Sequence, residues 1–272
     1  MNNILYPDSG NPLEDRSILR NAVYFSTAQR AYSAQLILQQ PLNMNNQTLA
    51  FSVIRAFEEF MTSTEDLIGW LFVLEQWQPG KVEFSLINLL DKIEVGRTKN
   101  KKDYTEARAV SLLSSIDAEG FRELIHVPEY DELVASGKSI ELVNNIKRSM
   151  PRKLEGWLKV AKMRAEEDRG MVRMFNKCKH HMLAFRTTQR GKEEIWLPTS
   201  FRIEEVPKRI LLGNGWLENS VNELRHLAGV ATSAQAILHD TLALILSSRY
   251  SEEYSVPQWI LRAYDTDYMW LQ

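Results

Sequence analysis

The chain has 272 residues, of which 44% are hydrophobic and 10% aromatic, so it can bury a substantial core and is not disordered as a whole. Its net charge of -2 excludes a generic basic protein that coats nucleic acid, but not a protein with a local basic site. The single cysteine, Cys178, excludes an internal disulfide and fits a reducing compartment.

No secretion signal or membrane segment is predicted. The first residues show neither the basic nor the apolar region of a signal peptide. The most apolar late stretch, residues 227–246, contains His239 and Asp240 and is more polar than a membrane span requires. We therefore expect a cytoplasmic protein.

Two long helices are predicted in the first third of the chain, after an irregular lead-in rich in proline and glycine. Apolar residues at three- and four-residue spacing predict a helix over 15–40, for which Asp15 is a candidate cap. The same spacing predicts a second helix over 46–76, which a Pro-Gly pair ends.

The middle of the chain is predicted to hold shorter helices around a charged loop at 96–103, whose basic residues we expect to be solvated. The expected helices are 83–93, 104–115, 118–125 and 129–135. Ser139 then opens a long helical stretch that contains Pro151. A proline inside a helix removes a hydrogen bond and clashes with the preceding turn, so we predict a break or kink there. A new helix beginning at Pro151 could reach His181.

Two short β-prone runs flank a glycine-bearing turn and predict a β-hairpin over 183–197. Residues 198–215 are predicted to be irregular, and a last long helix is predicted over 217–248. The aromatic residues of the tail after Pro257 are expected to pack on the body or on a partner subunit.

These elements predict an all-α helical bundle with one small β-hairpin at about 183–197, in a single helical domain of residues 1–272. The turn-like residues 136–138 allow a soft boundary. Six residues on the apolar stripes of their helices are predicted to be buried: Phe57, Phe60, Leu67, Leu71, Phe175 and Cys178.

Three motif-like features are better explained by structure than by chemistry. Residues 136–139 read SGKS but lack the earlier glycine of a phosphate-binding loop, where Glu132 stands, so Ser139 is expected to cap the next helix. The five histidines do not form the i,i+4 pair of a zinc helix, and no metal or cofactor is predicted. The carboxylates of the 46–76 helix, Glu58, Glu59, Glu65 and Asp66, are expected to form a solvated face.

One stretch, RMFNKCKHHMLAF at 173–185, gathers polar groups on one face. On a helix that advances about 100° per residue, Arg173 and His180 lie two turns apart on the polar side, flanked by Asn176 and Lys177. A guanidinium binds a phosphate through two parallel hydrogen bonds, and an imidazole moves protons near neutral pH. The face suits phosphate recognition or phosphodiester chemistry without a metal. Cations at the C-terminal end of any surface helix give a similar pattern, so a purely structural role stays open.

The same stretch resembles the HEPN (higher eukaryotes and prokaryotes nucleotide-binding) superfamily. An arginine followed by four to six residues and a histidine, late on a long helix, is typical of that family, and Asn176, Lys177, Lys179 and His180 are similar to an Asn-Lys-x-Lys-His segment of its bacterial members. In those members a short strand or hairpin follows the histidine, as is predicted here. The HEPN-like part would be roughly 139–250.

The resemblance implies catalytic roles for Arg173 and His180 and phosphate binding by Asn176 and Lys177. Active members are metal-independent ribonucleases that usually act as facing pairs of subunits, whereas others only bind nucleotides or partners. We therefore expect an RNA or nucleotide ligand and a homodimer. Active members usually have a polar residue directly after the arginine, where this chain has Met174, so the resemblance bears on fold more than on catalysis. The alternative is a non-catalytic helical scaffold or protein-interaction module.

Overall fold

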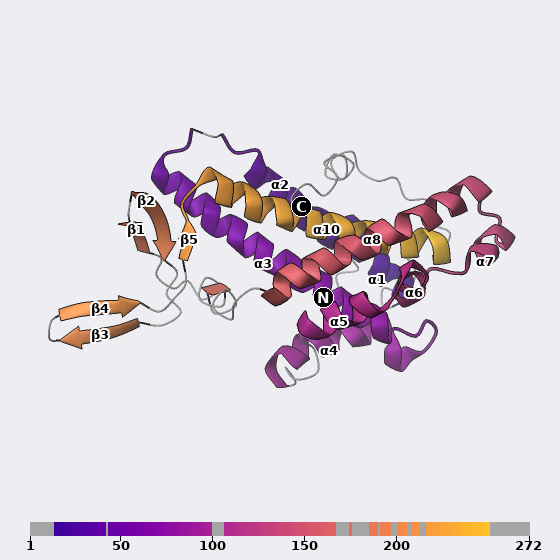
Figure 1. Cartoon of the computed structure of the whole chain (residues 1–272). Helices are drawn as coiled ribbons and strands as arrows, with labels where there is room; N and C mark the ends of the chain where they lie inside the picture. The colour runs from indigo at the N-terminus through magenta and orange to yellow at the C-terminus, as the bar shows by residue number, and fades with distance from the viewer. Residues whose placement is uncertain are drawn as a thin grey trace, which may run out of the picture.

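The computed structural model describes residues 14–41, 43–99, 106–166, 174–175, 185–189, 191–196, 201–205, 208–212 and 216–250. Within these residues the architecture is a helical bundle with small antiparallel sheets at one end (Figure 1). The prediction of a helical bundle with a small hairpin is confirmed.

The first helical segment changes its pitch along its length. α1 (Asp15–Asn21) runs without a break into a π-helical segment, η1 (Ala22–Thr27), and then into α2 (Ala28–Leu38). The predicted helix over 15–40 is therefore confirmed in outline, with a π-helical segment that the apolar spacing did not indicate.

Asp15 does not cap its own helix as predicted. The α1 helix is preceded by Glu14, which makes no side-chain capping bond. The Asp15 carboxylate instead accepts hydrogen bonds from the indole Nε1–H of Trp77 at 2.8 Å and from the backbone N–H of Leu86 at 2.7 Å. It therefore joins the start of α1 to two later points of the chain, Trp77 and Leu86.

The second long helix, α3 (Asn46–Gln76), has the predicted bounds. The side chain of Asn45 accepts hydrogen bonds from the backbone N–H groups of Gln47 and Thr48, which satisfies two of the free donors at the helix start. The chain leaves α3 through Gly80, whose φ of +84° favours glycine.

The next helices follow the predicted order with different ends. A single 3-10 turn, η2 (Val82–Phe84), precedes α4 (Leu86–Lys99). Because α4 continues to Lys99, the prediction of a loop from residue 96 is wrong for residues 96–99. Three short helices agree with the predictions to within two residues at each end: α5 (Glu106–Ser115), α6 (Ala118–Leu124) and α7 (Tyr130–Ala135).

The helix α8 (Ile140–Glu166) contains Pro151 without a break, so the prediction of a new helix starting there is wrong. A proline has a φ compatible with the α-helix, and its cost is local. Buried residues on both sides of it, such as Met150 and Trp157, hold the helix against the bundle. The Ser139 hydroxyl accepts from the N–H of Leu142 at 3.2 Å and caps α8 as predicted.

The last helix, α10 (Val221–Tyr250), lies at the centre of the bundle, where its most extensive contacts are with α3 and α2 (Figure 1). It is the one helix in the described part of the chain that is long and apolar enough to cross a membrane, but 89% of its most apolar window is buried inside the protein. The core helix of a globular protein can have the same length and composition as a membrane-spanning helix.

The predicted hairpin is present as β1 (Phe185–Gln189) and β2 (Lys192–Trp196), which pair antiparallel with Gln189 opposite Lys192. β5 (Trp216–Glu218) adds a third strand beside β2.

A second hairpin, β3 (Phe201–Glu205) with β4 (Lys208–Leu212), occupies a stretch predicted to be irregular, so that prediction is wrong. Its strands have only five residues each and are separated by two residues, one of them Pro207. The period-two alternation is therefore too short to stand out from the surrounding loop signals.

One continuous core joins the helices. It includes residues of α1, α3, α5, α8 and α10, and so lies on both sides of residues 136–138. Phe57, Phe60, Leu67, Leu71 and Phe175 are at most 2% exposed, which confirms the burial predicted for them. Cys178 lies outside the described residues.

Candidate functional site

All four residues of the predicted site, Arg173, Asn176, Lys177 and His180, lie outside the described residues. The two residues within that stretch that are described, Met174 and Phe175, are helical and are 2% and 1% exposed. The structure therefore describes these two residues and the elements of the bundle that precede and follow the site.

The pair is anchored on α3. The ring of Phe175 meets the ring of Phe57 edge to face, with 6.5 Å between the centroids and 88° between the planes. This geometry is a favoured one for two aromatic rings, and both side chains are buried. The candidate segment is thus attached to the core at its apolar side.

Before the segment, the end of α8 is fixed by a buried arginine. The guanidinium of Arg164 is 3.6 Å from the carboxylate of Glu65 on α3 and 3.7 Å from that of Glu106 on α5. The Arg164 side chain is 2% exposed, so its charge depends on these partners. The sequence contains a signal for this residue that we missed. Arg164 continues the apolar stripe of Trp157, Val160 and Ala161 at three- and four-residue spacing.

After the segment, the sheet is held against the start of α3. The carboxylate of Glu193 in β2 accepts hydrogen bonds from the side-chain amides of Asn46, at 2.7 Å, and Asn219, at 2.9 Å. The backbone N–H of Asn219 also donates to the Glu193 carbonyl at 2.9 Å. The elements on either side of the segment, α8 and the sheet, are therefore both attached to the same helix, α3.

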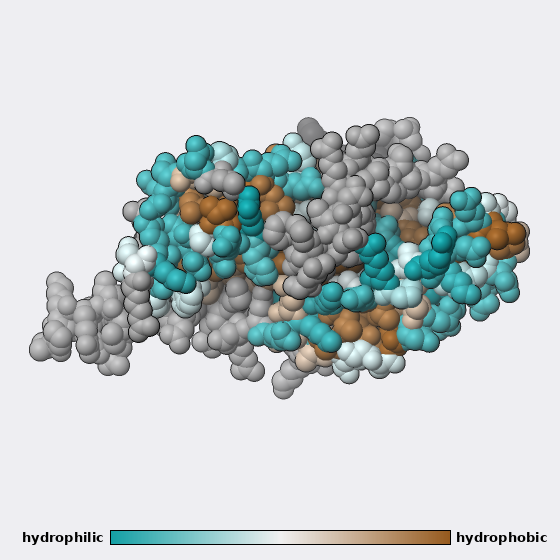
Figure 2. All heavy atoms as spheres, turned by 45° about the horizontal axis from the view of Figure 1, so that its top comes forward, coloured by the Kyte–Doolittle hydropathy of each residue, from teal (hydrophilic) through white to brown (hydrophobic). Residues whose placement is uncertain are grey.

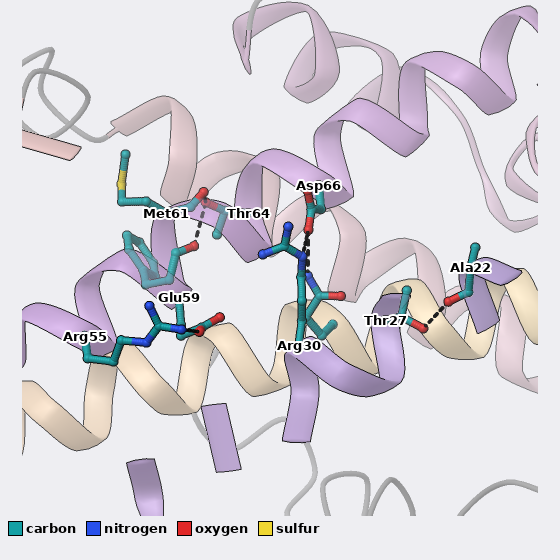
Figure 3. A network of polar contacts seen from close by, with 10 residues as sticks. Ala22, Thr27, Arg30, Arg55, Glu59, Met61, Thr64 and Asp66 are labelled. Atoms are coloured by element: carbon teal, nitrogen blue, oxygen red, sulfur yellow. Dashed lines mark hydrogen bonds and ion pairs between the residues drawn. The ribbon is translucent and has the colours of Figure 1, made fainter. Parts of the chain in front are cut away.

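The acidic face predicted on α3 is partly enclosed by the bundle, so the prediction of a solvated face is wrong for Asp66 and Glu59. Asp66 is 2.8 Å from the Nε of Arg30 on α2 and accepts from the Gln235 amide of α10 at 3.2 Å (Figure 3). Glu59 is 5% exposed and lies 2.8 Å from Arg55. Asp66 therefore joins α3 to α2 and α10, whereas the ion pair of Glu59 with Arg55 lies within α3. Because both carboxylates are engaged in ion pairs, they are poor candidates for acid–base chemistry.

His239 of α10 pairs with the π-helical segment. Its Nδ1 lies 2.8 Å from the hydroxyl of Thr27, and that hydroxyl donates to the carbonyl of Ala22 at 2.9 Å (Figure 3 shows the Thr27–Ala22 bond). The tautomer of the imidazole decides whether Nδ1 donates to this hydroxyl or accepts from it. Burial lowers the pKa of His239 to about 4, against an opposing hydrogen bond with the backbone of Val23. The imidazole is therefore neutral at pH 7 and structural.

A second histidine closes the turn after α6. His126 has a φ of +56°, and its Nε2 lies 2.8 Å from the carbonyl of Leu74. Its ring also packs against Trp77 at a centroid distance of 4.8 Å. Burial, with the nearby charge of Arg249, lowers the pKa of His126 despite the Leu74 hydrogen bond.

A buried lysine joins α8 to α10. Lys153 forms an ion pair with Asp240, whose side chain is 30% exposed. Burial and the charge of Arg152 lower the pKa of Lys153 to about 7, while contact with the Asp240 carboxylate favours the charged form. In the sequence, Asp240 stands out as a polar interruption of an apolar stretch, but nothing there indicates its partner on α8.

A metal site is not assembled by the part of the chain that the structure describes. Within it, no three residues among His, Cys, Asp and Glu come together in a group that could hold a metal ion. Comparison of the chain with models of protein families, with curated proteins and with solved structures gave no significant match.

Proposed function

We propose that residues 173–180 form a phosphate-binding site for RNA or a nucleotide, with Arg173 and His180 at its centre and Asn176 and Lys177 assisting. The observation that supports it best is the burial of Met174 and Phe175 as helical residues. On a helix with this phase, Cys178 is about 10° from the direction of the core, whereas Arg173 and His180 are about 150° and 170° away from it.

Local charge supports an anionic ligand. The α8 helix contains seven lysine and arginine residues and three glutamates, so it has a charge of +4 although the whole chain has -2. Two of these cations, Lys153 and Arg164, are buried in ion pairs, and most of the others lie on the solvent side of the helix. This cationic helix ends at Glu166, and only Glu167 and Asp168 add negative charge between it and Arg173. Its exposed cations raise the local concentration of a polyanion.

In the catalytic form of the proposal, the 2′-hydroxyl of an RNA nucleotide attacks its adjacent phosphorus. His180 accepts the hydroxyl proton, Arg173 holds the phosphate oxygens, and the bond to the 5′-oxygen breaks with a proton from water. The products have 2′,3′-cyclic phosphate and 5′-hydroxyl ends. Binding without cleavage is the non-catalytic form of the same site.

The test is a titration of the wild type, Arg173→Ala and His180→Ala against mixed RNA oligomers and nucleotides. Arg173→Ala should weaken binding by at least about 1.5 kcal/mol, the low end for a hydrogen bond to a charged group. His180→Ala should abolish cleavage and change the stability by less than about 0.5 kcal/mol, as surface changes usually do. Binding should weaken as salt rises.

Two matched variants serve as controls. His181→Ala removes the neighbouring imidazole, which is about 100° away around the helix, and Lys81→Ala removes an exposed cation that lies outside α8. Both should bind and cleave close to the wild type. Equal behaviour of all variants, or no binding by any of them, would refute the site and leave the scaffold alternative.

One observation favours that alternative as a second candidate. Several large apolar side chains are exposed, among them Phe25 at 62%, Tyr32 at 52% and Leu36 at 47% along η1 and α2. Figure 2 shows separate apolar patches on an otherwise mostly hydrophilic face. Exposed apolar residues that follow one helix side are typical of a surface that contacts another protein.

A further inference from the structure

The β3–β4 hairpin stands away from the helical body at one end of the molecule (Figure 1). In the described ranges, each of its strands pairs only with the other, in the register Phe201 to Leu212 through Glu205 to Lys208. A two-stranded hairpin is at best marginally stable alone in water, so a third strand on one of its edges would stabilise it.

The register divides the hairpin into two faces. Residues directly opposite each other in an antiparallel pair lie on the same side, and successive residues alternate. Phe201 and Ile203 therefore share a face with Leu212 and Ile210, and the Glu205–Lys208 pair ends this face at the turn. The other face contains Arg202, Glu204, Arg209 and Leu211. This mostly apolar face, and two edges with which no other described strand pairs, make the hairpin a candidate for strand addition.

The order of charges along β3 identifies the strand that fits. When β3, with the sequence FRIEE, is laid antiparallel to a second copy of itself about Ile203, Arg202 comes opposite Glu204 of the second copy. The two-fold symmetry repeats this pair on the other side. The strand β4, with the sequence KRILL, has no such complementarity, because a pairing centred on Ile210 puts Arg209 opposite a leucine.

We propose that the β3 edges of two copies of this chain pair antiparallel about Ile203 and form a four-stranded sheet in the order β4–β3–β3–β4. This pairing satisfies the open backbone groups of both β3 edges. It places Arg202 of each copy opposite Glu204 of the other copy. It also joins the apolar faces of the two hairpins across the central pair of Ile203 residues. The proposal rests on the second hairpin alone and does not depend on the phosphate site.

The test is the association state of the full chain, measured by sedimentation equilibrium over a range of protein concentrations. The wild type should form a dimer. Arg202→Glu places two glutamates opposite each other at both ends of the pairing, and should raise the dimer dissociation constant at least about tenfold.

A second variant reverses the other charge. Glu204→Arg combined with Arg209→Glu keeps opposite charges at these two paired positions of the hairpin, but it sets an arginine at position 204 opposite Arg202 of the second copy. This double variant should therefore also be monomeric at concentrations where the wild type is dimeric. A mixture of the two variants should form a one-to-one heterodimer, because each glutamate of one chain then faces an arginine of the other.

The matched control exchanges the charges at the hairpin end. Glu205→Lys with Lys208→Glu keeps the net charge and keeps opposite charges at this paired position, and position 205 faces Phe201 of the second copy in the proposed pairing. The control should dimerise like the wild type. A monomeric wild type, an unchanged dimer in Arg202→Glu, or a mixture without heterodimers would each overturn the proposal.

Discussion

The contact between Phe175 and Phe57 is where the candidate segment meets the core of the bundle. Phe175→Ala should lower the free energy of unfolding by about 3–5 kcal/mol, because it removes a fully buried ring and leaves a cavity against α3. Urea denaturation measures this loss. Phe25→Ala, at a position that is 62% exposed, is the matched control and should cost far less. A loss below about 1 kcal/mol for Phe175→Ala would show that the ring is not part of the core.

A second prediction at the scale of single residues concerns the loss of stability at acidic pH. Burial lowers the pKa of His239 from 6.5 to about 4, so the unfolded chain binds a proton more readily than the folded protein between these values. Stability from the neutral imidazole is therefore fully present above about pH 6.5 and is lost as the pH falls towards 4, by up to about 3 kcal/mol. The check is the unfolding free energy measured from pH 7.5 to 4.

A substitution separates His239 from the other titrating groups. His239→Gln should be less stable at pH 7, because it alters the contact with Thr27, but its stability should fall less steeply between pH 6.5 and 4. His226→Gln, at an exposed position, is the matched control for replacing a histidine by glutamine. An unchanged slope in His239→Gln would assign the acid sensitivity to other groups, with His126, whose pKa burial also lowers, as the next one to replace.

At the scale of elements, the uninterrupted course of α8 through Pro151 leads to a prediction. The ring removes the N–H that would donate to the carbonyl of Lys147 one turn earlier. Because Pro151 is exposed, an alanine can restore this bond without disturbing the core. Pro151→Ala should stabilise the protein by at least about 1 kcal/mol, below the cost of roughly 3 kcal/mol for a proline in an ideal helix. Thermal unfolding measures the effect, and a destabilised variant would show that the bundle requires a proline at that position.

The elements that could be predicted from sequence have strong local signals. The bounds of α3 follow from its three- and four-residue apolar spacing and from Asn45 at its start. The β1–β2 hairpin follows from its glycine turn, with Gly191 at a φ of +80°. The roles of Asp15, Glu193 and Arg164 could not be predicted, because each depends on partners tens of residues away in the chain. The candidate site stays a prediction, since its polar residues lie outside the described ranges.

At the scale of the whole molecule, the continuous core predicts one cooperative unit. Helices before and after residues 136–138 share one cluster of buried side chains, with α8 packed against α5, α6 and α10. Differential scanning calorimetry should therefore show a single transition whose calorimetric and van't Hoff enthalpies agree. Two resolved transitions would instead support a domain boundary at 136–138.

The central position of α10 has a consequence for biosynthesis. This helix packs mainly on α2 and α3, which leave the ribosome about 150 to 200 residues earlier, at a synthesis rate of roughly 5–20 residues per second. For several seconds α3 has been synthesised but its main packing partner, α10, has not. A nascent chain of this kind is a natural client for a chaperone that binds apolar helices, and chains that terminate before residue 221 should be insoluble when released.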